Sequence, residues 1–350
     1  MLIAIIGAGV VGCHIALKLK NKNNEVFLLE KEQWLWFHTS TRNSGVIHAG
    51  IYYPYYSLKR ELCVKGADLT YRFLKQLNVE HRKCGKIIVA KNEKERKELK
   101  KLYENGIKNG VKGLKLIGKS EIEKLEPNCK SEYALYSPNS GVVNCSDYYK
   151  KIEAFLQEKG VNVVNNCKVE NVNVTKKKVI TNRGELNYDV LINSAGLWAD
   201  EIAKMCGIEG FKIIPYKGDY YSLNEDTING MIYPVPTDEK GALGVHFTKT
   251  AYNEIWIGPT SKEFDRKDDY DVYEKKDIFV KACEVYLKKF NENKISVGFS
   301  GNRPKLFIHG KFVYDFVIFR RNNIIHLFGI DSPGLTAAPA IAEYVSELIL

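Results

Sequence analysis

The sequence lacks the patterns that would place it among disulfide-rich, zinc-binding or membrane-spanning proteins. Its eight cysteines contain no Cys-x-x-Cys pair, so we expect reduced thiols, no metal site and a cytoplasmic location. No run of about 18 uninterrupted apolar residues occurs, so no membrane span is predicted. The apolar first segment lacks a basic leader and is interrupted by Gly7, Gly9 and Gly12, which favours a buried strand and turn over a signal peptide.

Nucleic-acid-binding motifs are also lacking, although the chain is basic. Lys and Arg number 52 against 42 Asp and Glu, a formal net charge of +10. Part of the excess lies in residues 91–130, where Leu99, Leu102, Tyr103 and Ile107 have the spacing of a helix with a solvated face. We therefore expect no nucleic-acid partner. A small anionic substrate and a peripheral contact with the inner face of a membrane stay open as reasons for the charge.

The 350 residues, 45% of them hydrophobic, are enough for two domains. Helix-like and strand-like patterns alternate at both ends of the chain, whereas residues 211–260 contain successive strand-like runs typical of an antiparallel sheet. No long linker separates the two patterns, so we predict an α/β (α+β) fold with interleaved domains. The expected boundaries are 1–80, 141–210 and 300–350 for the first domain, and 81–140 and 211–299 for the second.

The periodicity also predicts individual elements. The expected strands outside 211–260 are 2–6, 25–29, 85–90, 161–165, a hairpin over 169–182, 189–193 and a strand from 323. The expected helices are 10–20, 93–109, 146–159 and 336 to the end of the chain.

A glycine-rich turn joins the first predicted strand to the first predicted helix. Its residues, Gly7-Ala8-Gly9-Val10-Val11-Gly12, have the G-x-G-x-x-G form, in which glycines allow a tight turn, a close pyrophosphate and close helix packing. The helix N-terminus favours the negative phosphates. Glu30, at the end of the second strand, is placed to accept hydrogen bonds from ribose hydroxyls. The unit predicts a Rossmann-like dinucleotide site, for NAD or FAD.

A second strand-turn-helix segment favours a flavin over a nicotinamide. Residues 329–336, GIDSPGLT, lie between a buried strand and the final helix, so that the helix start can face a bound ring system. A flavin gains negative charge near N1 and C2=O when it is reduced, and a helix N-terminus stabilises that charge. A nicotinamide has no such requirement.

Residues 38–66, HTSTRNSGVIHAGIYYPYYSLKRELCVKG, resemble the signature of the L-2-hydroxyglutarate dehydrogenase group within the D-amino-acid-oxidase-like (DAO) FAD-dependent oxidoreductases. The segments YKGDYY, IYPVP, LGVHFT, WIGP, GNRP and DSPGLT follow in the order of that family. The resemblance implies FAD, bound non-covalently or covalently. It also implies a Rossmann-like FAD-binding domain, the first of the two above, and an antiparallel-sheet substrate-binding domain that covers the flavin.

The motifs and the resemblance together predict the cofactor-binding residues. Ser40, Arg42 and Asn43 carry hydroxyl, guanidinium and amide donors suited to pyrophosphate and ribityl oxygens. The resemblance implies a backbone contact from Val169 to adenine. The full expected set is Gly7, Gly9, Gly12, Glu30, Lys31, Ser40, Thr41, Arg42, Asn43, Ser44, His48, Val169, Ala195, Gly196, Arg303, Asp331, Ser332, Pro333, Gly334, Leu335 and Thr336.

Oxidation of a 2-hydroxy acid requires a base for the hydroxyl proton and a cation for the carboxylate. His48 and His246 are the candidate bases, because the resemblance puts the first beside the flavin and the second on a strand of the substrate domain. Arg303 is the first candidate for the carboxylate, since a guanidinium can grip it with two hydrogen bonds, and Lys217 is the second. Tyr53 could add a phenolic donor, although such tyrosines are as often packing residues.

The resemblance implies an enzyme that oxidises a small 2-hydroxy acid, with L-2-hydroxyglutarate to 2-oxoglutarate as the leading expectation. Oxidation of glycerol 3-phosphate, or of an amine or amino acid, is the alternative on the same fold. A non-catalytic flavin- or nucleotide-binding module is the alternative of a different class. The electron acceptor, which could be a quinone, oxygen or a carrier protein, and the oligomeric state stay open, as does the choice between the two histidines.

Overall fold

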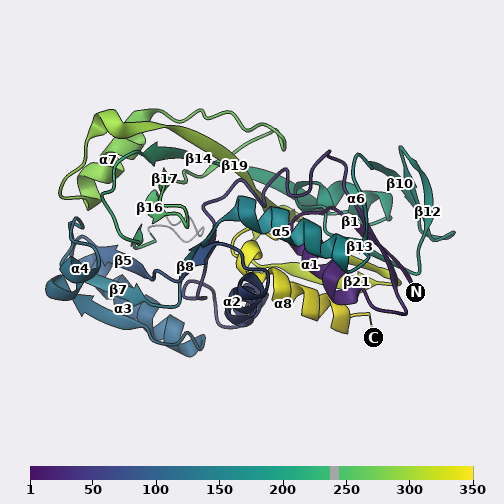
Figure 1. The fold of residues 1–350 in the computed structure, drawn as a ribbon, viewed down its shortest axis with the longest axis horizontal. Coiled ribbons are helices and arrows are strands. Elements are labelled where there is room, and N and C mark those ends of the chain that lie inside the picture. The colour runs from purple at the N-terminus through teal and green to yellow at the C-terminus, as the bar shows by residue number, and fades with distance from the viewer. Residues whose placement is uncertain (237–243, 350) are drawn as a thin grey trace.

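The computed structural model describes residues 1–236 and 244–349. In this part of the chain, one unit is built on a six-stranded sheet with the order β21-β22-β13-β1-β2-β9 (Figure 1). Its strands are β1 (Leu2–Ile6), β2 (Glu25–Leu29), β9 (Asn162–Val164), β13 (Val190–Asn193), β21 (Val317–Arg321) and β22 (Ile324–Phe328). All neighbouring pairs are parallel except β21 with β22. This is the arrangement of a Rossmann-like sheet.

Structural layers cover both faces of this sheet, which explains why β1 and β13 are apolar on both sides. The helices on one face are α1 (Val10–Leu19), α2 (Leu58–Gln76), α5 (Cys145–Glu158) and α8 (Gly334–Glu347). The elements on the other face are β10 (Val169–Asn173), β11 (Lys178–Thr181), β12 (Gly184–Asn187) and α6 (Ala199–Met205). α2 and α8 approach closely at Gly66, where a Cβ would lie 2.4 Å from the carbonyl oxygen of Thr336.

The second unit is built on a sheet that has ten strands within the described residues. The order is β20-β19-β14-β17-β16-β15-β5-β7-β6, and β18 pairs with β14. The strands are β5 (Lys86–Ala90), β6 (Lys115–Gly118), β7 (Tyr133–Ser137), β14 (Phe211–Leu223), β15 (Met231–Pro234), β16 (His246–Lys249), β17 (Ile255–Gly258), β18 (Lys262–Glu263), β19 (Ile295–Ile308) and β20 (Lys311–Val313).

The two faces of the second sheet have different neighbours. On one face, α4 (Lys119–Leu125) and α7 (Lys276–Tyr286) pack against apolar residues such as Ile87 and Phe247. On the other face, Ile88 and Tyr233 pack in one cluster with α3 (Glu93–Lys108), Val46 and Val142. Val46 and Val142 belong to a small sheet of β3 (Val46–Ile47), β8 (Gly141–Val143) and β4 (His81–Arg82), which joins the two units. One face of the second sheet therefore looks toward the first unit.

The expected α/β fold with interleaved units is confirmed, but two details differ. β5 and β15 pair in parallel, so the second sheet is not wholly antiparallel. The boundary expected at 300 falls inside β19, and because β19 and β20 both belong to the second sheet, we propose that the second domain extends to Val313.

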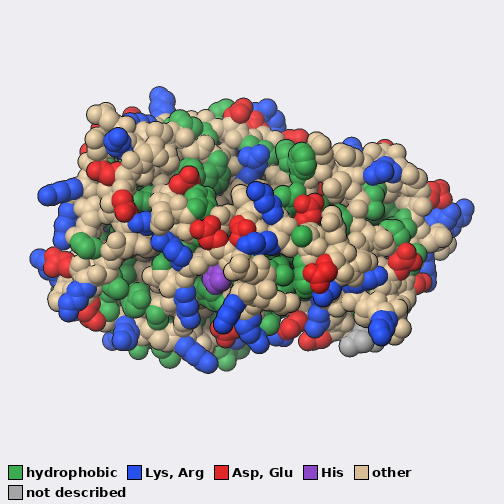
Figure 2. All heavy atoms as spheres, viewed as in Figure 1, with side chains coloured by type: hydrophobic (Ala, Val, Ile, Leu, Met, Phe, Trp, Pro, Cys, Tyr) green, Lys and Arg blue, Asp and Glu red, His purple; other side chains and the backbone are tan. Residues whose placement is uncertain are grey.

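Some expectations fall partly outside the described residues. The first residues of the strand expected over 241–250 lie outside the described residues. Residue 350, the last of the expected final helix, also lies outside them. In residues 1–236 and 244–349, none of the helices has both the length and the apolar character needed to cross a membrane. On the face in Figure 2, basic and acidic side chains are interspersed, so the net positive charge does not gather into one patch on that face.

Candidate functional site

Gly7 makes the turn that leads from β1 into α1. Its φ is +97°, and a Cβ there would lie 2.7 Å from the carbonyl oxygen of Ser194, so only glycine fits. At Gly9, a Cβ would lie 3.1 Å from Oγ of Ser40. This hydroxyl oxygen accepts a hydrogen bond from the Val10 N–H at 3.0 Å. The glycines therefore let the start of α1 approach both the end of β13 and the segment around Ser40.

Gly12 has the packing role that the motif assigns to its third glycine and does not itself make room for the pyrophosphate. A Cβ on Gly12 would lie 2.0 Å from the carbonyl oxygen of Gly7 and 2.9 Å from Oγ of Ser194. Gly12 is buried within α1. It allows the helix to pack on its own turn, so a larger side chain would displace Gly7 and disturb the phosphate site indirectly.

A cavity lies at the carboxyl ends of β1, β2 and β13, where ligands bind in Rossmann-like sheets. Eight of the expected cofactor residues line it: Gly7, Gly9, Glu30, Lys31, Ser40, Val169, Ala195 and Gly196. The buried carboxylate of Glu30 accepts hydrogen bonds from the backbone N–H of Ala8 at 2.9 Å and of Glu32 at 3.0 Å. Burial raises the pKa of Glu30. Each carboxylate oxygen has a second lone pair, so Glu30 can also accept hydrogen bonds from ribose hydroxyls.

The segment that follows Ser40 uses its polar side chains mainly to shape its own loop. Thr41 Oγ1 donates to the carbonyl oxygen of Trp36 at 2.8 Å, and Asn43 Nδ2 donates to that of Ser40 at 2.9 Å. The guanidinium of Arg42 lies 3.9 Å from the centroid of the Tyr270 ring. Direct side-chain contacts with the adenosine end are therefore not proposed for Thr41, Arg42, Asn43 or Ser44.

Aromatic residues that sequence reasoning missed complete this cavity. The ammonium of Lys31 lies 3.3 Å from the centroid of the Trp198 ring, and Phe37 and His38 line the same cavity. Trp198 ends the 3-10 turn Gly196–Trp198, directly after the small-residue pair that the family resemblance had marked. This adjacency could have indicated Trp198 as a site residue. The direction of its side chain, however, depends on the conformation of the turn.

His48 is held by the beginning of α8. Its backbone N–H donates to Thr336 Oγ1 at 3.0 Å, and its Nε2 lies 3.2 Å from Ser332 Oγ. Nδ1 is buried and has no hydrogen-bond partner among the described residues. Burial, together with a nearby ammonium, holds the pKa of His48 well below its usual value. The ring is therefore neutral at pH 7.

The rest of the turn before α8 has mainly structural contacts. Asp331 is buried, and its carboxylate binds the ammonium groups of Lys59 at 2.5 Å and Lys305 at 2.7 Å. Burial opposes ionisation of Asp331, but these two cations hold its pKa below the usual value. A contact of Asp331 with the cofactor is therefore not proposed. Pro333 precedes the first helical residue, Gly334, while Leu335 packs against the core of the first unit.

Tyr53 lies near His48. Burial raises the pKa of Tyr53 well above its usual value, and Ser332, the residue that also contacts the His48 ring, lies close enough to lower this pKa in part. Tyr53 is therefore a neutral hydrogen-bonding group on the His48 side, and its contact with a substrate stays a prediction.

The second sheet presents a row of polar side chains on the face that looks toward the first unit. Side chains alternate along a strand, so the strand register places five residues on this face: Arg303, Tyr220, His246, Tyr233 and Lys86. The rings of His246 and Tyr233 are stacked with centroids 3.8 Å apart. The ammonium of Lys86 lies 4.5 Å from the centroid of the Tyr233 ring.

The tautomer of His246 follows from its hydrogen bond. Nδ1 lies 2.9 Å from the carbonyl oxygen of Gly244. Because a carbonyl oxygen only accepts, Nδ1 carries the proton and Nε2 is left as an acceptor. Burial, with Lys86 and Arg303 nearby, lowers the pKa of His246 to about 3. The ring is thus neutral and has a free lone pair on Nε2.

Arg303 and Lys217, the two candidates for binding a carboxylate, differ in their surroundings. Among the described residues, Nη1 of Arg303 makes two long hydrogen bonds, to the carbonyl oxygen of Thr260 at 3.4 Å and Oγ of Ser261 at 3.3 Å. Lys217 is 4% exposed and forms an ion pair with Asp269. Strand alternation turns Lys217 to the other face of the sheet. Lys217 is therefore withdrawn as a candidate.

Comparison with known proteins identifies the family. Residues 3–348 match the model of the family DAO, FAD dependent oxidoreductase. The chain belongs to this family. It is similar to the mitochondrial L-2-hydroxyglutarate dehydrogenase of Homo sapiens, with 32% identity over 99% of this chain and 88% of that protein. It is also 31% identical to the L-2-hydroxyglutarate dehydrogenase of Indibacter alkaliphilus, over 99% of this chain and 98% of that protein.

Solved structures agree with this DAO family assignment. Dithionite-reduced L-alpha-glycerophosphate oxidase from Mycoplasma pneumoniae, with FAD bound, has a TM-score of 0.90 and 28% identity, covering 100% of this chain and 95% of that one. Glycine oxidase from Geobacillus kaustophilus has a TM-score of 0.83 at 17% identity, with 99% and 94% covered, which supports the fold alone. The expected FAD cofactor is confirmed by the family, whereas the cytoplasmic location stays a prediction.

The residues present fit FAD. The left-handed Gly7 and the absence of a Cβ on Gly9 leave room for a pyrophosphate, and the carboxylate of Glu30 reaches the cavity at the end of β2. At the other end of the site, the buried Nδ1 of His48 has no partner in the described structure. We propose that the adenosine half of FAD is held by the cavity residues and that the ring system lies between His48 and the polar row of the second sheet.

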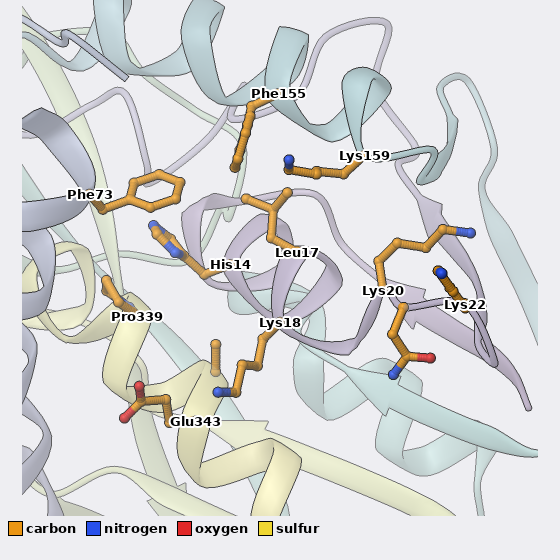
Figure 3. A pocket seen from close by; sticks show the side chains of 12 residues that line it. His14, Leu17, Lys18, Lys20, Lys22, Phe73, Phe155, Lys159, Pro339 and Glu343 are labelled. Atoms are coloured by element: carbon orange, nitrogen blue, oxygen red, sulfur yellow. The ribbon is translucent and has the colours of Figure 1, made fainter. Parts of the chain in front are cut away.

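A second cavity lies apart from this DAO site, between α1, α2, α5 and α8 (Figure 3). His14, Phe73 and Phe155 lie on one side of it, and Lys20 and Lys22 lie on the other. His14 Nε2 is 2.5 Å from the hydroxyl of Tyr148, and burial lowers the pKa of His14 to about 3. His14 is therefore a buried structural histidine.

Proposed function

We propose that this protein is an FAD-dependent dehydrogenase that oxidises L-2-hydroxyglutarate to 2-oxoglutarate. The observation that carries the proposal is the polar row, in which the neutral ring of His246 is close enough to both Arg303 and Lys86 for each cation to lower its pKa. A 2-hydroxy acid needs this combination of an acceptor for a proton and a cation for a carboxylate. The choice of substrate is supported by the relatives that are named L-2-hydroxyglutarate dehydrogenases.

The oxidation removes a hydride from C2 of the substrate and a proton from its hydroxyl group. FAD, when bound, supplies the two-electron acceptor for the hydride. Arg303 binds the carboxylate beside C2 and so fixes the orientation of the C2–H bond. Nε2 of His246 accepts the hydroxyl proton while the C2–O bond becomes a carbonyl. We assign His48 to the cofactor side, because the first turn of α8 holds its backbone and the turn before α8 holds its ring.

Rapid mixing of FAD-loaded variants with L-2-hydroxyglutarate under anaerobic conditions tests these roles. His246→Ala should retain FAD and reduce the flavin roughly 10²–10⁴ times more slowly, the range for loss of a general base. His48→Ala should instead change the flavin absorption spectrum or lower FAD content. His309→Asn, in a turn with no site contact, serves as the control and should behave as wild type. A normal rate in His246→Ala with an inactive His48→Ala would reverse the two roles.

Oxidation of glycerol 3-phosphate is the second candidate, because the structural relative at 28% identity is an L-alpha-glycerophosphate oxidase. A phosphate dianion would also bind to cations such as Arg303 and Lys86. Anaerobic flavin reduction by each compound separates the two functions. We expect rapid reduction by L-2-hydroxyglutarate and slow reduction by sn-glycerol 3-phosphate. The opposite order would favour the second candidate, and no reduction by either would favour a non-catalytic flavin-binding module.

A further inference from the structure

Lys86 is a buried lysine whose ammonium contacts aromatic rings but no anion among residues 1–236 and 244–349. It is the first residue of β5 and is 2% exposed. Its Nζ lies 4.6 Å from the ring centroid of Tyr52 and 4.5 Å from that of Tyr233. Burial lowers the pKa of Lys86 to about 7, and the one group nearby that raises it is the thiol of Cys63, with no carboxylate contributing among the described residues. One feature of the sequence indicates a buried lysine here: Lys86 is the first residue of the otherwise apolar strand KIIVA.

Other buried lysines of this chain have carboxylate partners. Lys59, Lys217 and Lys249 each form an ion pair with an aspartate. A buried ammonium without such a partner is costly, because it has lost its water. Cation–π contacts offset part of this cost, but they leave the three N–H donors of Lys86 unused. The contrast with the paired lysines indicates that the anion for Lys86 comes from a ligand.

Further unpartnered polar atoms lie around the same space. Nδ1 of His48 and the hydroxyl of Tyr52 are both buried without a hydrogen-bond partner in the described part of the chain. Lys86 contacts the Tyr52 ring and lowers the pKa of both His48 and His246. The ammonium therefore shares one polar space with the two candidate bases and does not lie in a separate part of the core.

We propose that Lys86 binds the second carboxylate of a dicarboxylic 2-hydroxy acid and makes the site selective for dicarboxylates over monocarboxylates of the same length. This inference rests on the proposed function. Arg303 on β19 and Lys86 on β5 are separated by the four strands β14, β17, β16 and β15, and both side chains approach His246 on β16. Two cations that reach the base from different sides match a substrate with one carboxylate at C2 and another at the end of a short chain.

The position of Lys86 also argues against a role as the base. A base must reach the hydroxyl at C2, which Arg303 draws toward its own side of the row, whereas the Nζ of Lys86 is held against Tyr52 and Tyr233. Lys86 is therefore assigned to the far end of the substrate as a specificity-determining residue.

Binding of non-oxidisable acids tests the proposal without any turnover. Glutarate and valerate, which both have five carbons, are titrated into FAD-loaded protein, and binding is followed by the change in flavin absorption and by calorimetry. We expect wild type to bind glutarate roughly 10–100 times more tightly than valerate, the effect of one charged hydrogen-bonded contact. Lys86→Met should remove this preference by weakening glutarate alone. Lys86→Arg should keep part of it. Lys83→Met removes an exposed lysine three residues away and should behave as wild type.

The results separate this inference from the proposed function. If Lys86→Met keeps the preference for glutarate, or weakens the binding of glutarate and valerate equally, the assignment of Lys86 is overturned. If wild type shows the preference but L-2-hydroxyglutarate does not reduce the flavin, the dicarboxylate site stands and the proposed oxidation fails. In turnover, Lys86→Met should raise KM for L-2-hydroxyglutarate with little change in kcat, and it should leave kcat/KM for L-2-hydroxyvalerate unchanged. Met is a neutral side chain of similar length, so folding should be preserved.

Discussion

Replacing Arg303 by alanine should weaken substrate binding while FAD stays bound. The hydrogen bonds of Arg303 Nη1 within the described part of the chain are long, 3.4 Å and 3.3 Å, so the guanidinium can turn to a carboxylate at little cost. Arg303 does not line the cavity at the carboxyl ends of β1, β2 and β13. A charged hydrogen bond contributes about 1.5–3 kcal/mol, so KM for L-2-hydroxyglutarate should rise roughly tenfold to hundredfold.

Steady-state kinetics with a dye acceptor, together with FAD content from absorption, measure this effect. Arg303→Lys should recover only part of the loss, because an ammonium cannot reproduce the two parallel hydrogen bonds of a guanidinium. Arg72→Ala, an exposed arginine of α2, is the control and should leave KM unchanged. An unchanged KM in Arg303→Ala would refute the reasoning, and a loss of FAD in this variant would place Arg303 at the cofactor instead.

Two further predictions concern the cofactor site and acid stability. Gly12→Val and Glu30→Arg should each lower FAD content after purification, the first by displacing Gly7 and the second by removing the ribose acceptor; full flavin content in both would contradict the dinucleotide site. His14 has a folded-state pKa of about 3, below its ordinary value of 6.5, so the unfolded chain binds a proton that the folded chain does not, and stability falls as the pH drops from 6.5 toward 3. The Tm of His14→Gln should therefore fall less between pH 7 and pH 5 than that of wild type, and parallel Tm profiles would contradict this.

Local patterns predicted the nucleotide unit well. The strand, the glycine turn, the first helix and Glu30 lie within thirty residues of one another, and each has a local physical signal. The expected strand 2–6 and helix 10–20 correspond to β1 and α1. Gly12 has the close packing expected of the third glycine, although one of the residues it packs on, Ser194, could not be identified from the motif. Ser194 lies at the end of β13, far along the sequence.

The catalytic side depends on contacts between distant segments, and the sequence could not supply these. Lys217 and Arg303 both have the charge required of a carboxylate-binding residue, but the pairing of β14 with β19 turns them to opposite faces of the sheet. Lys86 becomes a site residue only because β5 joins β15 in parallel, a pairing that the expected antiparallel sheet did not include. Helix α2 was also missed, although Ser57 caps its start through a hydrogen bond to the Arg60 N–H.

Anaerobic mixing of the FAD-loaded protein with L-2-hydroxyglutarate tests the central claim most directly, with the flavin spectrum and the organic acid product followed together. The account predicts loss of the oxidised-flavin absorption within the turnover time and one 2-oxoglutarate formed per flavin reduced. A flavin that stays oxidised with L-2-hydroxyglutarate, while dithionite reduces it normally, would contradict the account.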